Sequence, residues 1–197
     1  MARYILAFLA AVSLGAIVPQ FVALGFTHIV PYGLDHILFI LGLFFLTRDA
    51  FALLLQITLF TIAHSLTLGL SLQGWIALPS QWVEVAIALS IAFVAGENLV
   101  NARLTRWRPW VVFASGLVHG LGFAHTFEEI HVPVEAALPA LFSFNVGIEL
   151  GQLAVVGLAF TIVAAWWKRD SYPRLIARPA SATIALTGLY WAIQRSL

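Results

Sequence analysis

The chain has 197 residues, of which 61% are hydrophobic and only 10% are charged, and its formal net charge is +1. Soluble globular domains carry about 25% charged residues, so this composition and a mean hydropathy of +0.96 predict an integral membrane protein. Cysteine is absent and the one methionine is Met1. The sequence therefore excludes disulfides, iron–sulfur clusters and thiolate metal sites. The net charge arises from segregated charges and says nothing about nucleic acid, but no solvated Lys/Arg cluster lies outside the short loops, so we expect no nucleic-acid partner.

Apolar stretches of about 17 to 25 residues predict the spanning helices. We expect an all-α membrane protein, a compact polytopic bundle of about seven transmembrane helices that forms one domain over residues 1–197. The expected spans are residues 4–24, 29–46, 50–72, 82–100, 109–125, 136–167 and 180–194. Residues 1–24 also resemble a signal peptide, because Arg3 precedes an apolar run. We favour a retained first span, and cleavage would leave six.

The basic residues are segregated along these spans. With the N-terminus in the cytoplasm, only Arg195 falls outside, and nine of the ten Lys and Arg residues fall inside: Arg3, Arg48, Arg103, Arg106, Arg108, Lys168, Arg169, Arg174 and Arg178. The positive-inside rule thus favours a cytoplasmic N-terminus and an external C-terminus. The outer connections carry Glu128, Glu129, His131 and Glu135 instead. We expect this acidic mouth to attract cations.

Polar side chains within the spans indicate a site, because an ionisable group in hydrocarbon costs at least a few kcal/mol and usually faces a partner or a cavity. The main candidates fall in the outer half of the bundle: His28, Asp35, His36, His64, His119 and Glu149. Secondary candidates are Asn145, Gln152, Ser65, Glu84 and His125. A single intramembrane histidine often only bonds a carbonyl group, but convergence from four helices favours a shared site. Glu97 and Asn98 lie toward the other end, where we expect them to pair with a nearby arginine.

Helical spacing adds detail to this prediction. Asn145, Glu149 and Gln152 follow at i, i+4 and i+7, which places them in one polar stripe on an otherwise apolar helix. Two glycine pairs, at 116 and 120 and at 147 and 151, have the small-xxx-small spacing that lets membrane helices approach closely. We therefore expect close helix packing beside the polar residues.

The candidate ligands indicate the kind of metal. Imidazole and carboxylate groups suit Ni, Zn, Co and Fe, whereas Cu(I) prefers the thiolate and thioether ligands that the spans lack. Mg and Ca would not require so many histidines. The chemistry selects a divalent transition metal, and the ligands leave the choice among these four open.

Several blocks of sequence carry a family resemblance. GFTHIVPYGLDHILFILGL, FTIAHSLTLGL, the run that begins VEVAIALSI, GLVHGLGFA and FNVGIELGQL occur in that order over about residues 20–160. They resemble the HupE/UreJ family of bacterial inner-membrane proteins. The resemblance implies a permease that supplies nickel to hydrogenase or urease, with Asp35 and His36 as the family's Asp-His pair and His28 as its upstream histidine. His28 is followed by Ile29 rather than proline, which suggests the second branch of the family.

The functional expectation is a permease for a divalent transition metal of the nickel type. In it, the acidic mouth gathers cations, and His28, Asp35 and His36 capture them. The deeper ligands His64, His119 and Glu149 then hold them at an inner site. An intramembrane zinc metallohydrolase is the alternative, in which Asp35 or Glu149 activates a zinc-bound water and Ser65 and Ser115 assist. A membrane scaffold is a third possibility. The expected partners are the metal ion and the lipid bilayer, and assembly into a homo-oligomer is left open.

Overall fold

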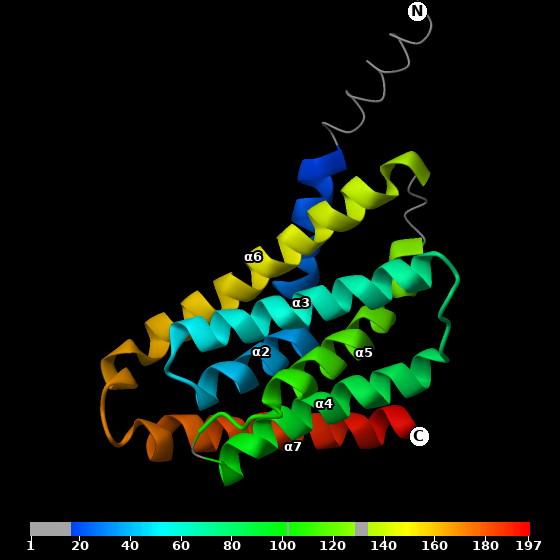
Figure 1. Ribbon diagram of the computed structural model, residues 1–197. Helices are drawn as coiled ribbons and strands as arrows, with labels where there is room; N and C mark the ends of the chain where they lie inside the picture. Colours follow the sequence, from blue (N-terminus) through cyan, green and yellow to red (C-terminus); the bar gives the residue numbers. More distant parts are fainter. Residues whose placement is uncertain (1–16, 102, 129–133) are drawn as a thin grey trace, which may run out of the picture.

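The computed structural model describes residues 17–101, 103–128 and 134–197, with the backbone alone for residues 124–128, 134 and 135. Within these ranges the chain is helical and contains no strand, as predicted. After an N-terminal helix, Ile17–Ile29, the described helices are α2 Leu34–Leu46, α3 Ala50–Leu72, α4 Ser80–Val100, α5 Arg108–Glu128, α6 Val134–Trp167, the short π-helix η1 Pro173–Ala177, and α7 Arg178–Ser196. They pack side by side as one bundle (Figure 1).

The first two helices differ from the predicted spans. Residues 25–28, which we expected to form a connection, belong to the helix Ile17–Ile29, and the chain breaks instead at residues 30–33. Pro31 and Gly33 explain this position, because proline lacks the amide hydrogen that a helix needs and glycine weakens helices. The two helices meet at an angle of 70°. Together they form either one broken span or a re-entrant loop, and residues 4–16 of the predicted first span lie outside the described ranges.

Among the described helices, α3, α4 and α6 are long and apolar enough to cross a membrane alone, and the broken pair raises the number to four. The remaining two long helices, α5 and α7, pack along these spans: α5 against α3, and α7 against α4. Both are more polar, since α5 begins at Arg108 and α7 contains Arg178 and Arg195. The predicted all-α membrane bundle is thus confirmed.

The two ends of the bundle differ in charge. Of the nine Lys and Arg residues in the described ranges, eight lie at the end where α2 meets α3, α4 meets α5 and α6 meets α7. Arg195 lies at the opposite end, beside the C-terminus and the connection between α3 and α4 (Figure 1). The predicted segregation of basic residues is therefore preserved in three dimensions. We call these the basic end and the mouth end.

Glycine brings three pairs of helices into close contact. A Cβ atom on Gly120 of α5 would overlap the carbonyl oxygen of His64 in α3, and one on Gly147 of α6 would overlap that of Val22 in the N-terminal helix. On α7, a Cβ atom on Gly188 would lie 2.7 Å from the amide nitrogen of Ala92 in α4. The close packing predicted from the glycine spacing is confirmed for α3 with α5 and for α6 with the N-terminal helix.

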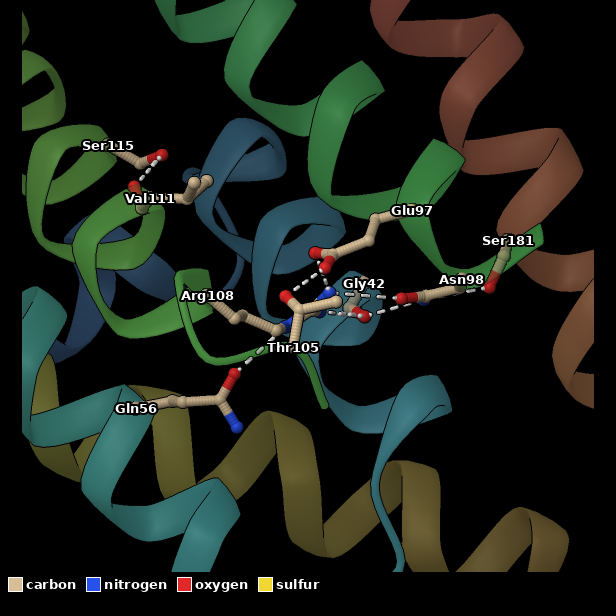
Figure 2. Close-up of polar contacts among 9 residues, drawn as sticks. All are labelled: Gly42, Gln56, Glu97, Asn98, Thr105, Arg108, Val111, Ser115 and Ser181. Carbon is tan, nitrogen blue, oxygen red and sulfur yellow. Dashed lines mark hydrogen bonds and ion pairs between the residues drawn. The ribbon is translucent and has the colours of Figure 1, made fainter. Parts of the chain in front are cut away.

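A buried ion pair ties the helices together near the basic end. Arg108, which is 1% exposed, donates to Glu97 Oε2 at 2.6 Å, to Gln56 Oε1 at 3.0 Å and to the carbonyl of Gly42 at 3.2 Å (Figure 2). Asn98 accepts a further bond from Arg108 at 3.3 Å. The prediction that Glu97 and Asn98 pair with an arginine is confirmed. Because Arg108 begins α5 and its partners belong to α2, α3 and α4, polar contacts join these four helices at this end.

Candidate metal centre

Three histidines from three helices meet inside the bundle. His28 lies at the end of the N-terminal helix, His36 in the first turns of α2 and His64 in the middle of α3. One ring nitrogen from each lies within 4.8 Å of the other two. His36 and His64 are buried, at 6% and 0% exposure, and His28 is partly buried. The break at residues 30–33 is what turns His28 and His36 toward each other, with ring centroids 4.7 Å apart.

His119 of α5 adjoins this group without belonging to the three. Its ring centroid lies 4.9 Å from that of His36, and its Nε2 atom lies 3.0 Å from the Ser90 hydroxyl of α4. The side chain is 1% exposed. Ser90 therefore holds one ring nitrogen of His119, while the other has no partner within the described protein. His119 is thus a fourth imidazole at the edge of the cluster.

Aromatic rings enclose the histidines. Phe60 lies against both His36 and His119, at centroid distances of 5.7 Å and 5.1 Å, and Phe123 lies 4.1 Å from His28. Such walls supply no hydrogen-bond acceptor to a buried imidazole, and they lower the local dielectric. Interactions between the histidines and a charged ligand are correspondingly stronger here than in water.

Several ring nitrogens of the four histidines lack partners. Five of these buried atoms have no hydrogen bond within the described protein: His28 Nε2, His36 Nε2, His64 Nδ1, His64 Nε2 and His119 Nδ1. A buried polar group left unsatisfied costs about 1–3 kcal/mol, so a purely structural role would leave a large part of this cost uncompensated. A ligand that accepts one lone pair from each imidazole removes this cost at one nitrogen of each ring. The donor set therefore fits a divalent transition metal.

The spacing of the ring nitrogens shows how far they must move to bind a metal ion. Zinc–nitrogen bonds of about 2.0–2.1 Å place tetrahedral ligand atoms about 3.3 Å apart. The three histidine nitrogens lie within 4.8 Å of one another, so their separations must shorten by at most about 1.5 Å to reach this spacing. Small rotations of the imidazole rings are enough to produce this displacement. The group resembles a site with three protein ligands that keeps a position open.

Asp35 is paired with an arginine at the mouth of the site. Its carboxylate accepts hydrogen bonds from Arg195 at 3.1 Å and 3.2 Å, and Glu84 lies 3.9 Å from the same guanidinium group. Arg195 also lies over the ring of Trp191. A hollow of about 440 Å³ connects these groups with the cluster and is lined by residues that include His28, His36 and His119. Asp35 and Glu84 therefore lie on the access route.

The polar stripe of α6 faces α3. Glu149 accepts a hydrogen bond from Thr58 at 2.7 Å, and Gln152 accepts one from Thr61 at 3.0 Å. Asn145 donates to the carbonyl of Leu141 in its own helix. Glu149, Asn145 and Thr58 line an apolar groove of about 440 Å³ between α3 and α6, as does Ser65. The stripe joins the two helices along a face that is separate from the mouth.

Other predicted residues lie elsewhere. Ser65 and Ser115 donate to carbonyl groups of their own helices, at 2.6 Å and 2.7 Å. The side chain of His125 lies outside the described part of the chain. The predicted acidic mouth also falls outside it: Glu129 and His131 entirely, and Glu128 and Glu135 in their side chains.

Sequence reasoning missed two residues that contact the site. Arg195 was identified as the single basic residue outside, and a lone base among acidic groups is a signal for an ion pair. Ser90 carries no such signal, because one serine in an apolar helix usually bonds its own backbone. Ser90 does so here, donating to Ile87 O at 2.7 Å while it also contacts His119.

Comparison with known proteins identifies the family. No curated protein and no solved structure matches the chain. A family model described as HupE / UreJ protein matches residues 7–195, which is nearly the whole chain. The resemblance stated from sequence motifs is thus confirmed over a longer range than the motifs cover. Combined with the apolar helices and the buried histidine cluster, this match establishes that the chain belongs to the HupE/UreJ family of membrane proteins.

Proposed function

We propose that the protein is a permease for a divalent transition metal of the nickel type, and that the histidine cluster is its binding site. The observation that carries this proposal is the meeting of three imidazoles, with unsatisfied nitrogens, across a break between two helices. Transporters commonly build substrate sites from interrupted membrane helices, because the break frees side chains and backbone groups inside the bundle. Membership of the HupE/UreJ family supports metal as the cargo.

In the proposed route, the cation enters the hollow at the mouth end, where Asp35 and Glu84 provide negative charge. Arg195 neutralises part of that negative charge, so an incoming ion competes with the guanidinium group for Asp35. The ion then passes to His36, which follows Asp35 directly, and is held with His28 and His64. His119, oriented by Ser90, is positioned to accept the ion next or to complete its coordination.

We further infer that the basic end faces the cytoplasm of a bacterium and the mouth end faces the periplasm. The basis is the location of eight described Lys and Arg residues at one end, which the positive-inside rule assigns to the cytoplasm. Ser196 at the end of α7 is then periplasmic. A cytoplasmic N-terminus stays a prediction, because residues 1–16 lie outside the described ranges.

An intramembrane zinc hydrolase is the alternative, since three histidines with an open position also suit a catalytic zinc ion. A hydrolase needs a carboxylate that can act as a base on zinc-bound water. Asp35 is engaged by Arg195, and Glu149 accepts a hydrogen bond from Thr58 on the α3–α6 face. Both carboxylates therefore have other partners, which favours transport over hydrolysis.

The test measures metal binding and flux with the same protein. Purified protein is analysed for bound Ni, Zn, Co and Fe, and its affinity and uptake are measured in proteoliposomes. We expect His36→Ala and His64→Ala each to weaken binding by about tenfold or more and to reduce uptake. Ser115→Ala is the matched control, because its hydroxyl bonds only Val111 of its own helix. Wild-type affinity in both histidine variants would rule out the cluster as the metal site.

A further inference from the structure

A second hollow lies at the basic end, far from the mouth in the bundle. Its volume is about 650 Å³, and it lies between the connections that join α2 to α3, α4 to α5 and α6 to α7. Three arginines line it: Arg48 of the α2–α3 connection, Arg103 of the α4–α5 connection, and Arg178, the first residue of α7. The proposed metal route uses none of these residues. The hollow therefore needs an explanation of its own.

The three guanidinium groups have few partners. Within the described ranges, none of them lies within 4.0 Å of a carboxylate oxygen. Two acids line the hollow as well, but Asp49 is committed to the start of α3, where its carboxylate accepts from the amides of Phe51 and Ala52. Asp170 is exposed at the surface of the α6–α7 connection. The lining thus retains unused cationic donors.

A buried hydroxyl group adds to this lining. Tyr172 is 2% exposed, and its hydroxyl has no hydrogen-bond partner in the described protein. Burial raises the pKa of this phenol to about 12, although Arg48, which lies over the ring, acts in the opposite direction. The hydroxyl therefore stays protonated at neutral pH and can donate. Arg48 uses one of its five donors on the carbonyl of Arg169, at 3.3 Å.

We propose that this hollow binds a phosphate group, and that the phosphate belongs to the headgroup of an anionic lipid. Arginine is suited to phosphate, because its planar fork presents paired donors to two oxygens. Basic pockets between membrane helices on the cytoplasmic side favour anionic headgroups. The lining also contains Phe45, Leu46 and Leu104, apolar side chains that suit the upper part of an acyl chain. A free phosphate would leave these apolar groups unused.

The test compares lipids that differ in headgroup charge. Binding of short-chain phosphatidylglycerol and phosphatidylcholine to the full-length protein is measured in detergent by native mass spectrometry. We expect phosphatidylglycerol to bind at least about tenfold more tightly, and Arg48→Gln/Arg178→Gln to remove most of that preference. Lys168→Gln/Arg174→Gln is the matched control, because it removes the same charge from the same end at residues that do not line the hollow.

Three outcomes decide the proposal. Equal losses in the two double variants, or no preference for phosphatidylglycerol, would show that only general surface charge attracts lipid and would overturn it. Displacement of the lipid by millimolar inorganic phosphate would assign the site to free phosphate and overturn the lipid assignment. Retained preference in the control together with loss in Arg48→Gln/Arg178→Gln supports the proposal. Arg103→Gln, at an exposed position, serves as a second variant if the double variant does not fold.

Discussion

Removing both members of the buried pair of Arg108 and Glu97 should destabilise the bundle by clearly less than the sum of the two single removals. The two side chains are 1% and 2% exposed and lie 2.6 Å apart, so neither charge can be solvated by water when its partner is lost. In Glu97→Gln, Arg108 keeps its bonds to Gln56 and to the carbonyl of Gly42 but loses its counter-charge. In Arg108→Gln, Glu97 keeps only the hydrogen bond from Thr105 at 2.5 Å.

The magnitude follows from the cost of an uncompensated buried charge. Breaking a buried ion pair by removing one partner costs about 3–5 kcal/mol, because the remaining charge stays desolvated. We expect Glu97→Gln near the lower value, since Arg108 retains other acceptors, and Arg108→Gln near the upper value. The variant Glu97→Gln/Arg108→Gln leaves no orphan charge and should cost less than the sum by about 2 kcal/mol or more.

The free energy of unfolding of all four proteins is measured by titrating sodium dodecyl sulfate into mild detergent micelles and following helix content. Metal affinity of the folded proteins serves as a check, because the pair contacts none of the cluster histidines. Additive losses, with the double variant as unstable as both single variants together, would refute the reasoning. Such a result would mean that the pair contributes through separate contacts and not through charge compensation.

Three further results are expected. Arg195→Gln frees Asp35 and Glu84, so metal uptake at low salt should reach half-saturation at a metal concentration roughly threefold to tenfold lower. High salt should abolish this gain. An unchanged or higher half-saturation concentration would contradict competition between Arg195 and the ion. Glu149→Gln should retain the melting temperature, because an amide can also accept from Thr58, while flux should fall because the substitution removes a carboxylate charge that offsets the ion during passage; wild-type flux would leave Glu149 a structural contact between α3 and α6. Arg106→Cys, in a chain without native thiols, should resist an impermeant thiol reagent in intact cells, and labelling there would reverse the proposed orientation.

Local sequence was sufficient to predict the elements and much of the cluster. Long apolar runs, separated by charged or proline-containing connections, predict helices with little ambiguity, because hydrocarbon leaves the backbone few alternatives. His36, His64 and His119 were grouped by their depth in separate spans. The pairing of Glu97 with an arginine was predictable, because either charge alone is unfavourable in an apolar environment. These successes share one cause, namely that polar groups in an apolar environment need partners.

The pairings between particular residues could not be predicted in the same way. The ion pair of Asp35 with Arg195, 160 residues away in sequence, was not predicted, because adjacent residues on a helix point about 100° apart and Asp35 and His36 contact different neighbours. The hydrogen bond that Glu149 accepts from Thr58 was not predicted either. The roles of both carboxylates as metal ligands stay predictions. Helix rotation depends on packing against neighbours, which a single sequence does not reveal.

The glycine contacts divide the bundle into units that carry different ligands. His64 and His119 belong to α3 and α5, which are held together at Gly120, whereas His28 belongs to the N-terminal helix, which is held to α6 at Gly147. A sliding or tilting motion between these two units, which would have to break the bonds from α3 to Glu149 and Gln152, would separate His28 from His64 while leaving His64 and His119 in place. The number of imidazoles around an ion would then change with the relative position of the units. Release could thus arise from rigid-body motion that reduces the coordination number, without any change in the fold of a single helix.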